Sequence, residues 1–122
     1  MAKKVLGEHG IGHERLQELL DRLLPQLKTI FQDKLHRVIL YGSYARGNED
    51  IESDLDILVL VKENQENLKK YNDTLLDVSV DLSLEYGLVL SIRTKSVAEY
   101  AKYAQFMPFY KNVEREGILL YG

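Results

Sequence analysis

The feature that most constrains this chain is a pair of short apolar, β-prone runs at residues 38–41 (VILY) and 57–61 (ILVLV), with a polar segment between them. Short apolar runs bounded by turn residues are typical of buried strands. The polar segment contains Gly42, Ser43, Arg46, Gly47, Ser53, Asp54 and Asp56. The sequence therefore predicts two strands, with most of the chain's recognisable chemistry placed between them.

Length and composition limit the classes of protein to consider. A chain of 122 residues with 45% apolar and 29% charged residues is typical of one globular domain. A formal charge of -3 disfavours a nucleic-acid partner, since no general basic field attracts phosphate backbones. The absence of cysteine excludes disulfides and cysteine zinc sites, and we expect a cytoplasmic protein. No apolar run has the length of a signal-peptide core or a membrane span, so no membrane partner is expected.

The first half of the chain predicts a tail, a helix and a strand. Residues 1–12 contain three glycines and no sustained period, so we expect a flexible tail and a single domain over 13–122. Leucines from residue 16 to 24 recur at helical spacing, and Pro25 is expected to end or kink that helix. A second amphipathic turn at 27–31 and a strand at 36–41 follow.

The second half predicts a long helix at 66–86, although residues 78–86 alternate strictly between apolar and polar, which is also a strand pattern. The helix is preferred because its apolar face begins before the alternation and Gly87 suits a helix end. A strand at 88–93, a helix opened by a Ser96–Glu99 capping box and closed by Pro108, a short helix or turn at 109–116, and a strand at 118–121 complete the order. The predicted fold class is α/β (α+β), a small mixed sheet of about four strands with helices packed on it.

The turn after the first strand has the residues of a phosphate-binding loop. Gly42 permits close backbone approach, Ser43 offers a hydroxyl, and Arg46 adds positive charge about one turn later. A strand that ends in Gly-Ser and leads into a helix presents backbone N–H groups to an anion. The sequence therefore predicts a cradle for a nucleotide's phosphates.

Two carboxylates stand at the start of the next strand. Asp54 and Asp56 are two residues apart, so strand geometry places both on one face, while Leu55 and Ile57 face the core. Mg²⁺ prefers one or two carboxylates and completes its shell with water and phosphate oxygens. Each feature alone is common in surface turns and strand edges. A phosphate cradle beside a Mg²⁺ pair, however, is what phosphoryl or nucleotidyl transfer requires.

The motif GSYARG followed by SDLDILV resembles the signature of the DNA polymerase beta-type nucleotidyltransferase superfamily, and the short chain resembles its minimal nucleotidyltransferase (MNT) branch. The resemblance implies a nucleotidyltransferase fold, with Gly42 and Ser43 holding the triphosphate and Asp54 and Asp56 binding Mg²⁺. Arg46 and Ser53 are the further nucleotide-binding residues that we predict. Many MNT proteins are antitoxins paired with a HEPN-domain toxin, and some transfer AMP from ATP to its tyrosines. The resemblance thus implies ATP as substrate and a HEPN-type partner.

One position departs from the family pattern. The family commonly places a third acidic residue on the following strand, where this chain has Ser91. Serine is a poor base and metal ligand at neutral pH, so reduced activity, another route of acceptor activation, and binding without turnover all stay open. Asp81 and Glu85, expected on the long helix, are poor substitutes. Arg93 shares the face of Ser91 and is either a phosphate contact or a surface residue.

The sequence also leaves the role of one aromatic group open. Tyr103, Phe106, Phe109 and Tyr110 form either a partner-docking surface or ordinary core packing around Pro108.

Overall fold

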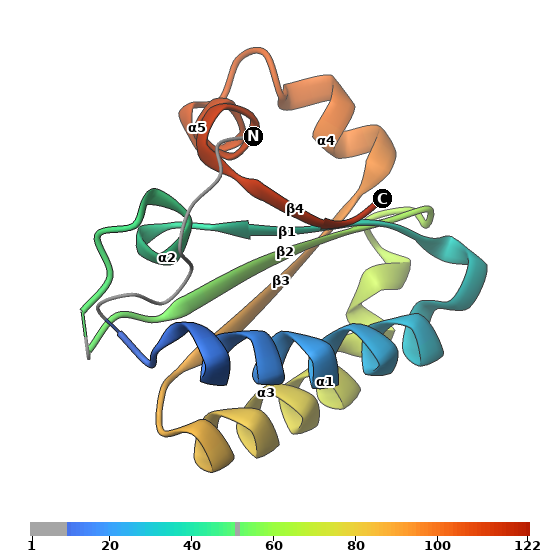
Figure 1. The fold of residues 1–122 in the computed structure, drawn as a ribbon. Helices are drawn as coiled ribbons and strands as arrows, with labels where there is room; N and C mark the ends of the chain where they lie inside the picture. The colour runs from blue at the N-terminus through green and yellow to red at the C-terminus, as the bar shows by residue number, and fades with distance from the viewer. Residues whose placement is uncertain (1–9, 51) are drawn as a thin grey trace.

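The computed structural model describes residues 10–50 and 52–122. Within these residues the chain forms one four-stranded sheet with strand order β3-β2-β1-β4 (Figure 1). The strands are Leu35–Tyr41 (β1), Leu55–Val61 (β2), Leu90–Ser96 (β3) and Ile118–Tyr121 (β4). β1 is antiparallel to β2 and β4, whereas β2 and β3 are parallel. The predicted fold class, a small mixed sheet with packed helices, is confirmed.

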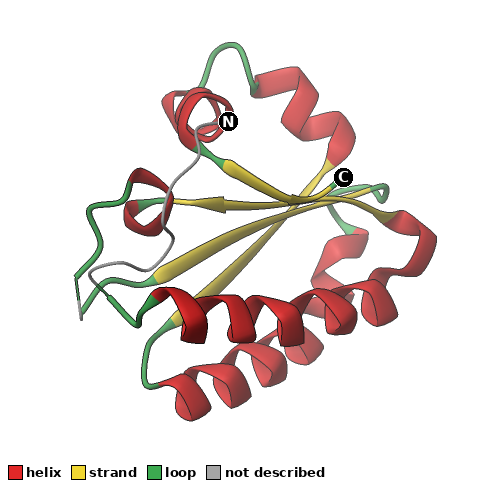
Figure 2. Ribbon diagram, viewed as in Figure 1, coloured by secondary structure: helices red, strands yellow, loops and turns green. Residues whose placement is uncertain are grey.

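Helices cover both faces of the sheet (Figure 2). The helices His13–Phe31 (α1) and Asn72–Tyr86 (α3) lie on one face, and Val97–Tyr103 (α4) and Pro108–Glu116 (α5) lie on the other. A single helical turn, Ser43–Arg46 (α2), follows β1, and two 3₁₀ turns, Gln32–Lys34 (η1) and Asn67–Tyr71 (η2), precede β1 and α3. The parallel strands β2 and β3 are joined by α3, as a parallel pair requires a crossover connection.

The central strand β2 explains why this sequence needs two layers of helices. Leu55, Ile57 and Val59 are fully buried in the core formed with α1 and α3, while Leu58 and Leu60 are buried against α4 and α5. A strand buried on both faces reads as a continuous apolar run, as 57–61 does. Asp56, Leu58 and Leu60 point to the same side of β2, toward α4 and α5. Asp56 is the first of them, near the start of the strand, and it is only half-buried.

Pro25 was predicted to end or kink the first helix. It does not end it, because α1 continues to Phe31 with Pro25 inside it. Pro25 is exposed, so its ring and its missing N–H face solvent. The buried residues of α1 keep one face across this point: Leu16, Leu19, Leu20, Leu23, Leu27 and Phe31. Burial of this long apolar face outweighs the local cost of the proline.

Three boundaries near the C-terminus also differ from prediction. Pro108 does not close α4, which ends at Tyr103, but begins α5, where its missing N–H leaves no bond unmade. β3 begins two residues later and ends three residues later than the predicted 88–93. Ser96 caps α4 by accepting the Glu99 N–H at 3.0 Å, as predicted, but its own N–H donates to Gln65 Oε1 at 3.1 Å. In a complete capping box the Glu99 side chain would accept the Ser96 N–H, and here Gln65 accepts it instead.

Residues 78–86 are helical, which confirms the preferred reading of the alternating segment. Val78, Leu82 and Tyr86 are buried, whereas Val80 and Leu84 are exposed at 44% and 79%. The strand-like alternation therefore comes from a helix with apolar residues on two faces. One face belongs to the core, and the other is exposed among residues 10–50 and 52–122.

Most of the predicted flexible tail, residues 1–9, lies outside the described residues. Ile11 is half-buried against the main core, and its N–H donates to the Tyr44 hydroxyl at 3.2 Å. The chain is thus anchored shortly before α1 begins. Across the part of the chain that the structure describes, no helix combines the length and apolar character needed to cross a membrane.

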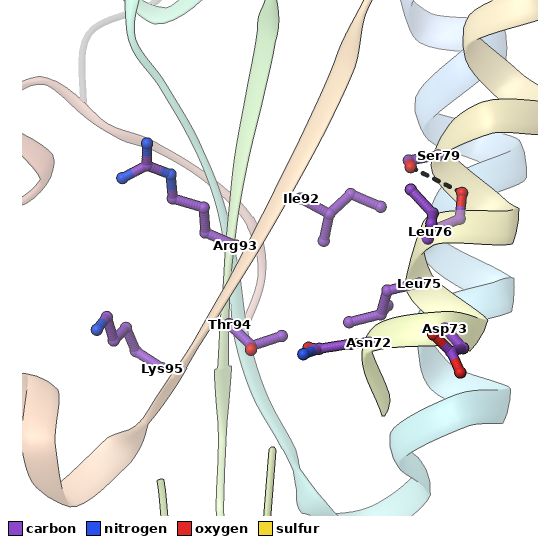
Figure 3. Close-up of a pocket in the computed structure, with 9 residues that line it drawn as sticks. All are labelled: Asn72, Asp73, Leu75, Leu76, Ser79, Ile92, Arg93, Thr94 and Lys95. Atoms are coloured by element: carbon purple, nitrogen blue, oxygen red, sulfur yellow. Dashed lines mark hydrogen bonds between the residues drawn. The ribbon is translucent and has the colours of Figure 1, made fainter. Parts of the chain in front are cut away.

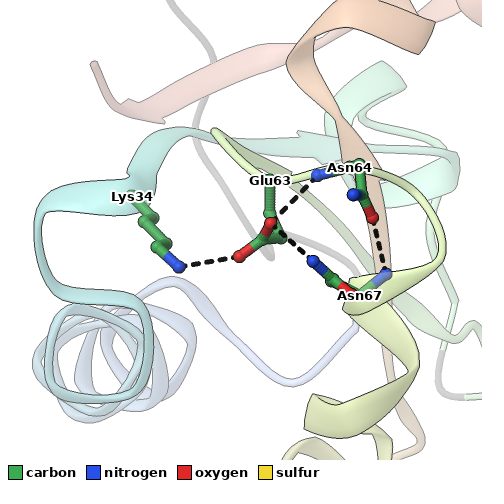
Figure 4. A network of polar contacts seen from close by, with 4 residues as sticks. All are labelled: Lys34, Glu63, Asn64 and Asn67. Carbon is green, nitrogen blue, oxygen red and sulfur yellow. Dashed lines mark hydrogen bonds and ion pairs between the residues drawn. The ribbon is translucent and has the colours of Figure 1, made fainter.

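A polar network stabilises the end of the sheet that lies away from α2 (Figure 4). The Glu63 carboxylate accepts from Lys34 Nζ at 2.7 Å, from Asn67 Nδ2 at 3.1 Å and from the Asn64 N–H at 3.2 Å. The hydrogen bond from Lys34, with those from Asn67 and Asn64, lowers the pKa of Glu63 to about 2. The charged carboxylate therefore ties η1 to the turn that follows β2.

Replacing Glu63 by Gln is expected to lower the melting temperature at neutral pH. Because the pKa of Glu63 is lower in the folded state than its ordinary value of 4.5, its stabilisation is complete above pH 4.5 and is lost as the pH falls toward about 2. Thermal melts from pH 7 to pH 2 should therefore show a difference between wild type and variant that shrinks below pH 4.5. The exposed Glu66→Gln change is the control, and a difference independent of pH would contradict this account.

Candidate active site

The predicted phosphate loop follows β1 directly. Gly42 has φ 77° and ψ -154°, a backbone conformation open essentially to glycine alone, and it turns the chain into α2. Tyr41 pairs with Asp56 across the antiparallel strands β1 and β2. A Cβ at Gly42 would overlap Oδ2 of Asp56. The glycine therefore lets the Asp56 carboxylate lie directly against the backbone at the start of α2.

The surroundings of Asp56 disfavour the charged form of its carboxyl group. Burial raises the pKa of its carboxyl above the ordinary value, and the negative charge of Asp54 raises it further. Arg93 and Arg46 act in the opposite direction and lower that pKa. Two neighbouring carboxylates with partial cationic compensation form a donor set that a divalent cation would stabilise.

The two aspartates fit Mg²⁺ better than they fit a metal ion whose ligands all come from protein side chains. Among residues 10–50 and 52–122, no group of three or more histidine, aspartate and glutamate side chains could hold a metal ion. Mg²⁺ commonly takes one or two carboxylates and fills its other positions with water and substrate phosphates. Asp54, which is exposed just before β2, and the half-buried Asp56 match that requirement.

Arg46, at the end of α2, points toward α5. Its Nη1 lies 3.7 Å from Oε2 of Glu116 in a partly exposed ion pair. A hollow of about 210 Å³ lies beside this pair and is lined by Tyr41, Gly42, Arg46, Phe109, Asn112, Val113 and Glu116. The loop that carries the predicted phosphate contacts thus opens onto a small recess between α2 and α5.

The two predicted serines have different settings. Ser43 is the first residue of α2, and its carbonyl accepts the Gly47 and Asn48 N–H groups. The Ser53 hydroxyl accepts the Asp50 N–H at 2.9 Å and lies 3.4 Å from Asp50 Oδ1, so it helps to form the turn before β2. A nucleotide contact by either serine stays a prediction.

Comparison with known proteins identifies the family. A family model described as the nucleotidyltransferase domain matches residues 20–116, which include the loop after β1 and both aspartates. The chain belongs to this family.

Curated relatives of the nucleotidyltransferase chain come from Methanocaldococcus jannaschii. One that carries the name "Putative protein adenylyltransferase" is 39% identical over 93 residues, covering 70% of this chain and 92% of its own length. A second with the same descriptive name is 30% identical over 105 residues, covering 86% of this chain and 97% of its own. The similarity therefore spans nearly the whole of both relatives.

Solved structures share the fold at low sequence identity. A crystal structure of a toxin–antitoxin pair with AMP-PNP matches with TM-score 0.51 and 19% identity, covering 89% of this chain and 72% of that chain. A structure of the tri-AMPylated HEPN toxin of Shewanella oneidensis in complex with MNT antitoxin matches with TM-score 0.51 and 18% identity, covering 87% and 71%. The fold is thus that of nucleotidyltransferase-like proteins.

Ser91 lies beside the aspartate pair of this nucleotidyltransferase. The parallel register of β2 and β3 pairs Asp56 with Ser91 and Leu58 with Arg93. Side chains of directly paired residues share a face of the sheet, so Ser91 and Arg93 lie on the face of Asp56. Glu85, by contrast, lies on α3 and forms an ion pair with Arg22 of α1. It is therefore engaged on the opposite face of the sheet from Asp56.

The sequence interpretation missed the aromatic and α5 side of the site. The rings of Tyr41 and Phe109 meet edge to face, with centroids 5.3 Å apart, and the Arg93 guanidinium lies over the Phe109 ring at 5.6 Å. The Tyr41 hydroxyl is buried with no hydrogen-bond partner in the described part of the chain. Burial raises the pKa of this phenol, Arg93 lowers it and Asp56 raises it. The sequence signal that could have placed Tyr41 in the site is its position as the last residue of β1, directly before Gly42.

The aromatic group left open above proves to be core packing for the most part. Tyr110 is buried, and Tyr103 and Phe109 are half-buried in the core formed with α4 and α5. Phe106 alone of these four is 74% exposed, between α4 and α5. The group therefore attaches α5 to the sheet and so places Glu116 and Phe109 beside the loop after β1.

Proposed function

We propose that this protein is a Mg²⁺-dependent nucleotidyltransferase that transfers AMP from ATP to a tyrosine hydroxyl of a HEPN-type toxin, and so acts as an antitoxin in the cytoplasm. The observation that carries the proposal is the contact between Asp56 and the backbone of Gly42, with Asp54 and two arginines close by. This contact supports a site in which the aspartate pair and the predicted phosphate loop act together, as nucleotidyl transfer requires.

The reaction forms one bond and breaks one. The acceptor hydroxyl oxygen bonds to the α-phosphorus of ATP, the bond from that phosphorus to the bridging oxygen breaks, and pyrophosphate leaves with the electron pair. The hydroxyl proton passes to a nearby base or to solvent. When bound, Mg²⁺ would offset the negative charge of the phosphates and orient them for in-line attack.

Each residue of the site has a role in this proposal. Asp54 and Asp56 would hold Mg²⁺, and the backbone of Gly42 and Ser43 would bind the triphosphate. Arg46 forms an ion pair with Glu116 at 3.7 Å. A bound triphosphate would compete with Glu116 for the guanidinium group, because charge-assisted hydrogen bonds from arginine to phosphate are shorter and stronger than this contact. Arg93, whose charge already reaches Asp56, would add a second cation on the same face. In this proposal, backbone N–H groups and two arginines would bind ATP.

The acceptor and the partner are suggested by the related proteins. The curated relatives are named as protein adenylyltransferases, and one structural neighbour is a complex with a tri-AMPylated HEPN toxin. Another contains AMP-PNP, an ATP analogue. These names support ATP as donor and a HEPN protein as acceptor for this chain.

The first test is a thermal-shift titration with ATP, GTP, CTP and UTP, with and without Mg²⁺. A ligand that binds only the folded state raises the melting temperature, and this readout requires no knowledge of the acceptor. We expect a shift with ATP that depends on Mg²⁺. Incubation of the purified chain with a HEPN partner and ATP should then add adenylate to a partner tyrosine by mass spectrometry. A partner that stays unmodified while the Mg²⁺-dependent shift persists would reject the proposed transfer.

A second function has a specific observation in its favour. Ser91 stands beside Asp56 where a third carboxylate would help to deprotonate the acceptor. A chain that binds nucleotide without turnover could neutralise its toxin by contact alone.

The change Ser91→Asp separates these two functions. If Ser91 limits catalysis, the aspartate should increase the transfer rate by about 100-fold, the low end of what a general base contributes. Ser91→Asn, of similar size and neutral, is the control and should give no increase. Single-turnover label transfer from ATP measures both variants. An equal rate for Ser91→Asp and wild type would show that the acceptor proton leaves by another route.

A further inference from the structure

The second apolar face of α3 is the strongest feature that the active site does not explain. Leu76, Val80 and Leu84 recur at four-residue spacing and are exposed at 60%, 44% and 79%. We call these three residues the α3 stripe. Residues at this spacing lie one above another along a helix. Val89, just before β3, is a further exposed apolar residue, at 58%. Apolar residues that are exposed together along one helix face, rather than singly, indicate an interaction site.

The α3 stripe borders a groove at a free edge of the sheet. β3 is an outer strand in the order β3-β2-β1-β4, so its outer N–H and C=O groups have no neighbouring strand in the described sheet. A hollow of about 550 Å³ lies between α3 and β3. Figure 3 shows Ile92 and Thr94 pointing toward α3, with Leu76 opposite them. The groove has an apolar floor and a polar backbone along one side.

The two lips of this groove carry opposite charges. Asp73, Asp77 and Asp81 also recur at four-residue spacing, between the stripe and the side of α3 that meets α1. On the other lip, Arg93 and Lys95 of β3 project away from α3 (Figure 3). An apolar centre with an acidic flank on one side and a basic flank on the other is self-complementary when two helices pack in parallel, as in coiled coils with opposite charges at their flanking positions.

We infer that a second copy of this chain binds here, with a two-fold axis parallel to α3. In this arrangement each α3 stripe lies in the groove of the other copy and covers its β3 edge. Rotation about such an axis places the acidic row of one α3 against the basic lip of the other copy, and the contact is reciprocal. An axis perpendicular to the sheet would instead bring the two acidic rows together and the two basic lips together, which like-charge repulsion disfavours.

The axis also fixes which residues meet. A rotation parallel to α3 keeps residues at the same height, and Asp73 and Lys95 line the same hollow. Lys95 of one copy therefore faces Asp73 of the other. The inference does not depend on the proposed function, because the α3 stripe, Asp73 and Lys95 lie outside the nucleotide site. Arg93, whose charge also reaches Asp56, is shared by the two and stays unchanged in the test variants.

Sedimentation equilibrium over a range of concentrations tests the dimer. We expect the wild type to dimerise, and Val80→Asp, at the centre of the stripe, to raise the dimer dissociation constant by about tenfold or more. Leu84→Ser should weaken the dimer in the same direction. Phe106→Ser removes an equally exposed apolar side chain elsewhere and should leave the dimer unchanged. All of these residues are exposed, so thermal melts and the ATP shift should report an intact fold.

A charge exchange tests the orientation. Asp73→Lys and Lys95→Asp should each raise the dissociation constant several-fold, and the double variant should recover most of the loss. A wild type that is monomeric at every concentration would overturn the inference and assign the stripe to a different protein. A double variant as weak as the sum of its single changes, or a dimer insensitive to Val80→Asp, would overturn it as well.

Discussion

Replacing Asp56 by Asn is expected to reduce nucleotidyl transfer on the order of 10³-fold, because the variant loses the charge that would hold the metal at the phosphate loop. The size and position of the side chain are kept, so the backbone of Gly42 retains its neighbour. The Mg²⁺-dependent thermal shift with ATP should disappear together with the transfer of label. Asp54→Asn should have the same direction of effect.

The same variant should not be less stable, and this distinguishes loss of function from loss of fold. Because the pKa of Asp56 is raised in the folded state, chiefly by burial and then by Asp54, its charged form costs stability at neutral pH. A neutral Asn removes that cost, so the melting temperature at pH 7 should be equal or higher. The advantage should shrink as the pH falls toward 3.8, the ordinary pKa of an aspartate, where the wild-type carboxyl is also neutral.

Glu52→Gln is the matched control for this experiment. Glu52 is exposed in the loop before β2, and the change removes one negative charge near the site without touching the Gly42 contact. It should leave transfer and the ATP shift nearly unchanged. Transfer at the wild-type rate by Asp56→Asn would show that the aspartate pair is not the metal site.

Replacing Gly42 by Ala is the second change with a large expected effect. The backbone at φ 77° and ψ -154° is strained for any residue with a Cβ, at a cost of order 1–3 kcal/mol, and the new methyl group would overlap Asp56 Oδ2. Either the loop or the carboxylate must move. We expect transfer to fall by about 10²-fold or more, since displacement of a positioned group by about 1 Å has that effect. The melting temperature should fall by several degrees.

Gly87→Ala separates the two causes. Gly87 ends α3 in the left-handed conformation, with φ 68° and ψ 35°, and a Cβ there would meet nothing within 4 Å. The change should cost about 1–2 kcal/mol of stability through its backbone alone and leave transfer unchanged. Equal losses of transfer in the two variants would show that Gly42 acts only through stability. A larger loss at Gly42 would show that its contact with Asp56 matters for the chemistry.

The elements of this fold could be predicted from the sequence where the signal is local. The alternation of Leu55, Asp56 and Ile57 between two faces follows from strand geometry, and the buried leucines of α1 follow from helical spacing. Boundaries were less accurate where a proline had two permitted roles. Pro25 lies inside α1, because burial of the long apolar face continues the helix past it. Pro108 begins α5, because the first position of a helix needs no N–H from it.

The sequence by itself determined the residues of the candidate site: a glycine-serine turn, an arginine one turn later, and two aspartates at the start of the next strand. The motif stays within one stretch of chain, so its residue types and spacing are visible without a structure. Only the tertiary structure decided what surrounds it. The register of β2 and β3 puts Ser91 beside Asp56, and the packing of α5 brings Glu116 to Arg46. It also left the second apolar face of α3 exposed in the described part of the chain. These contacts join residues far apart in the chain, and they depend on strand pairing and helix packing, which local spacing does not specify.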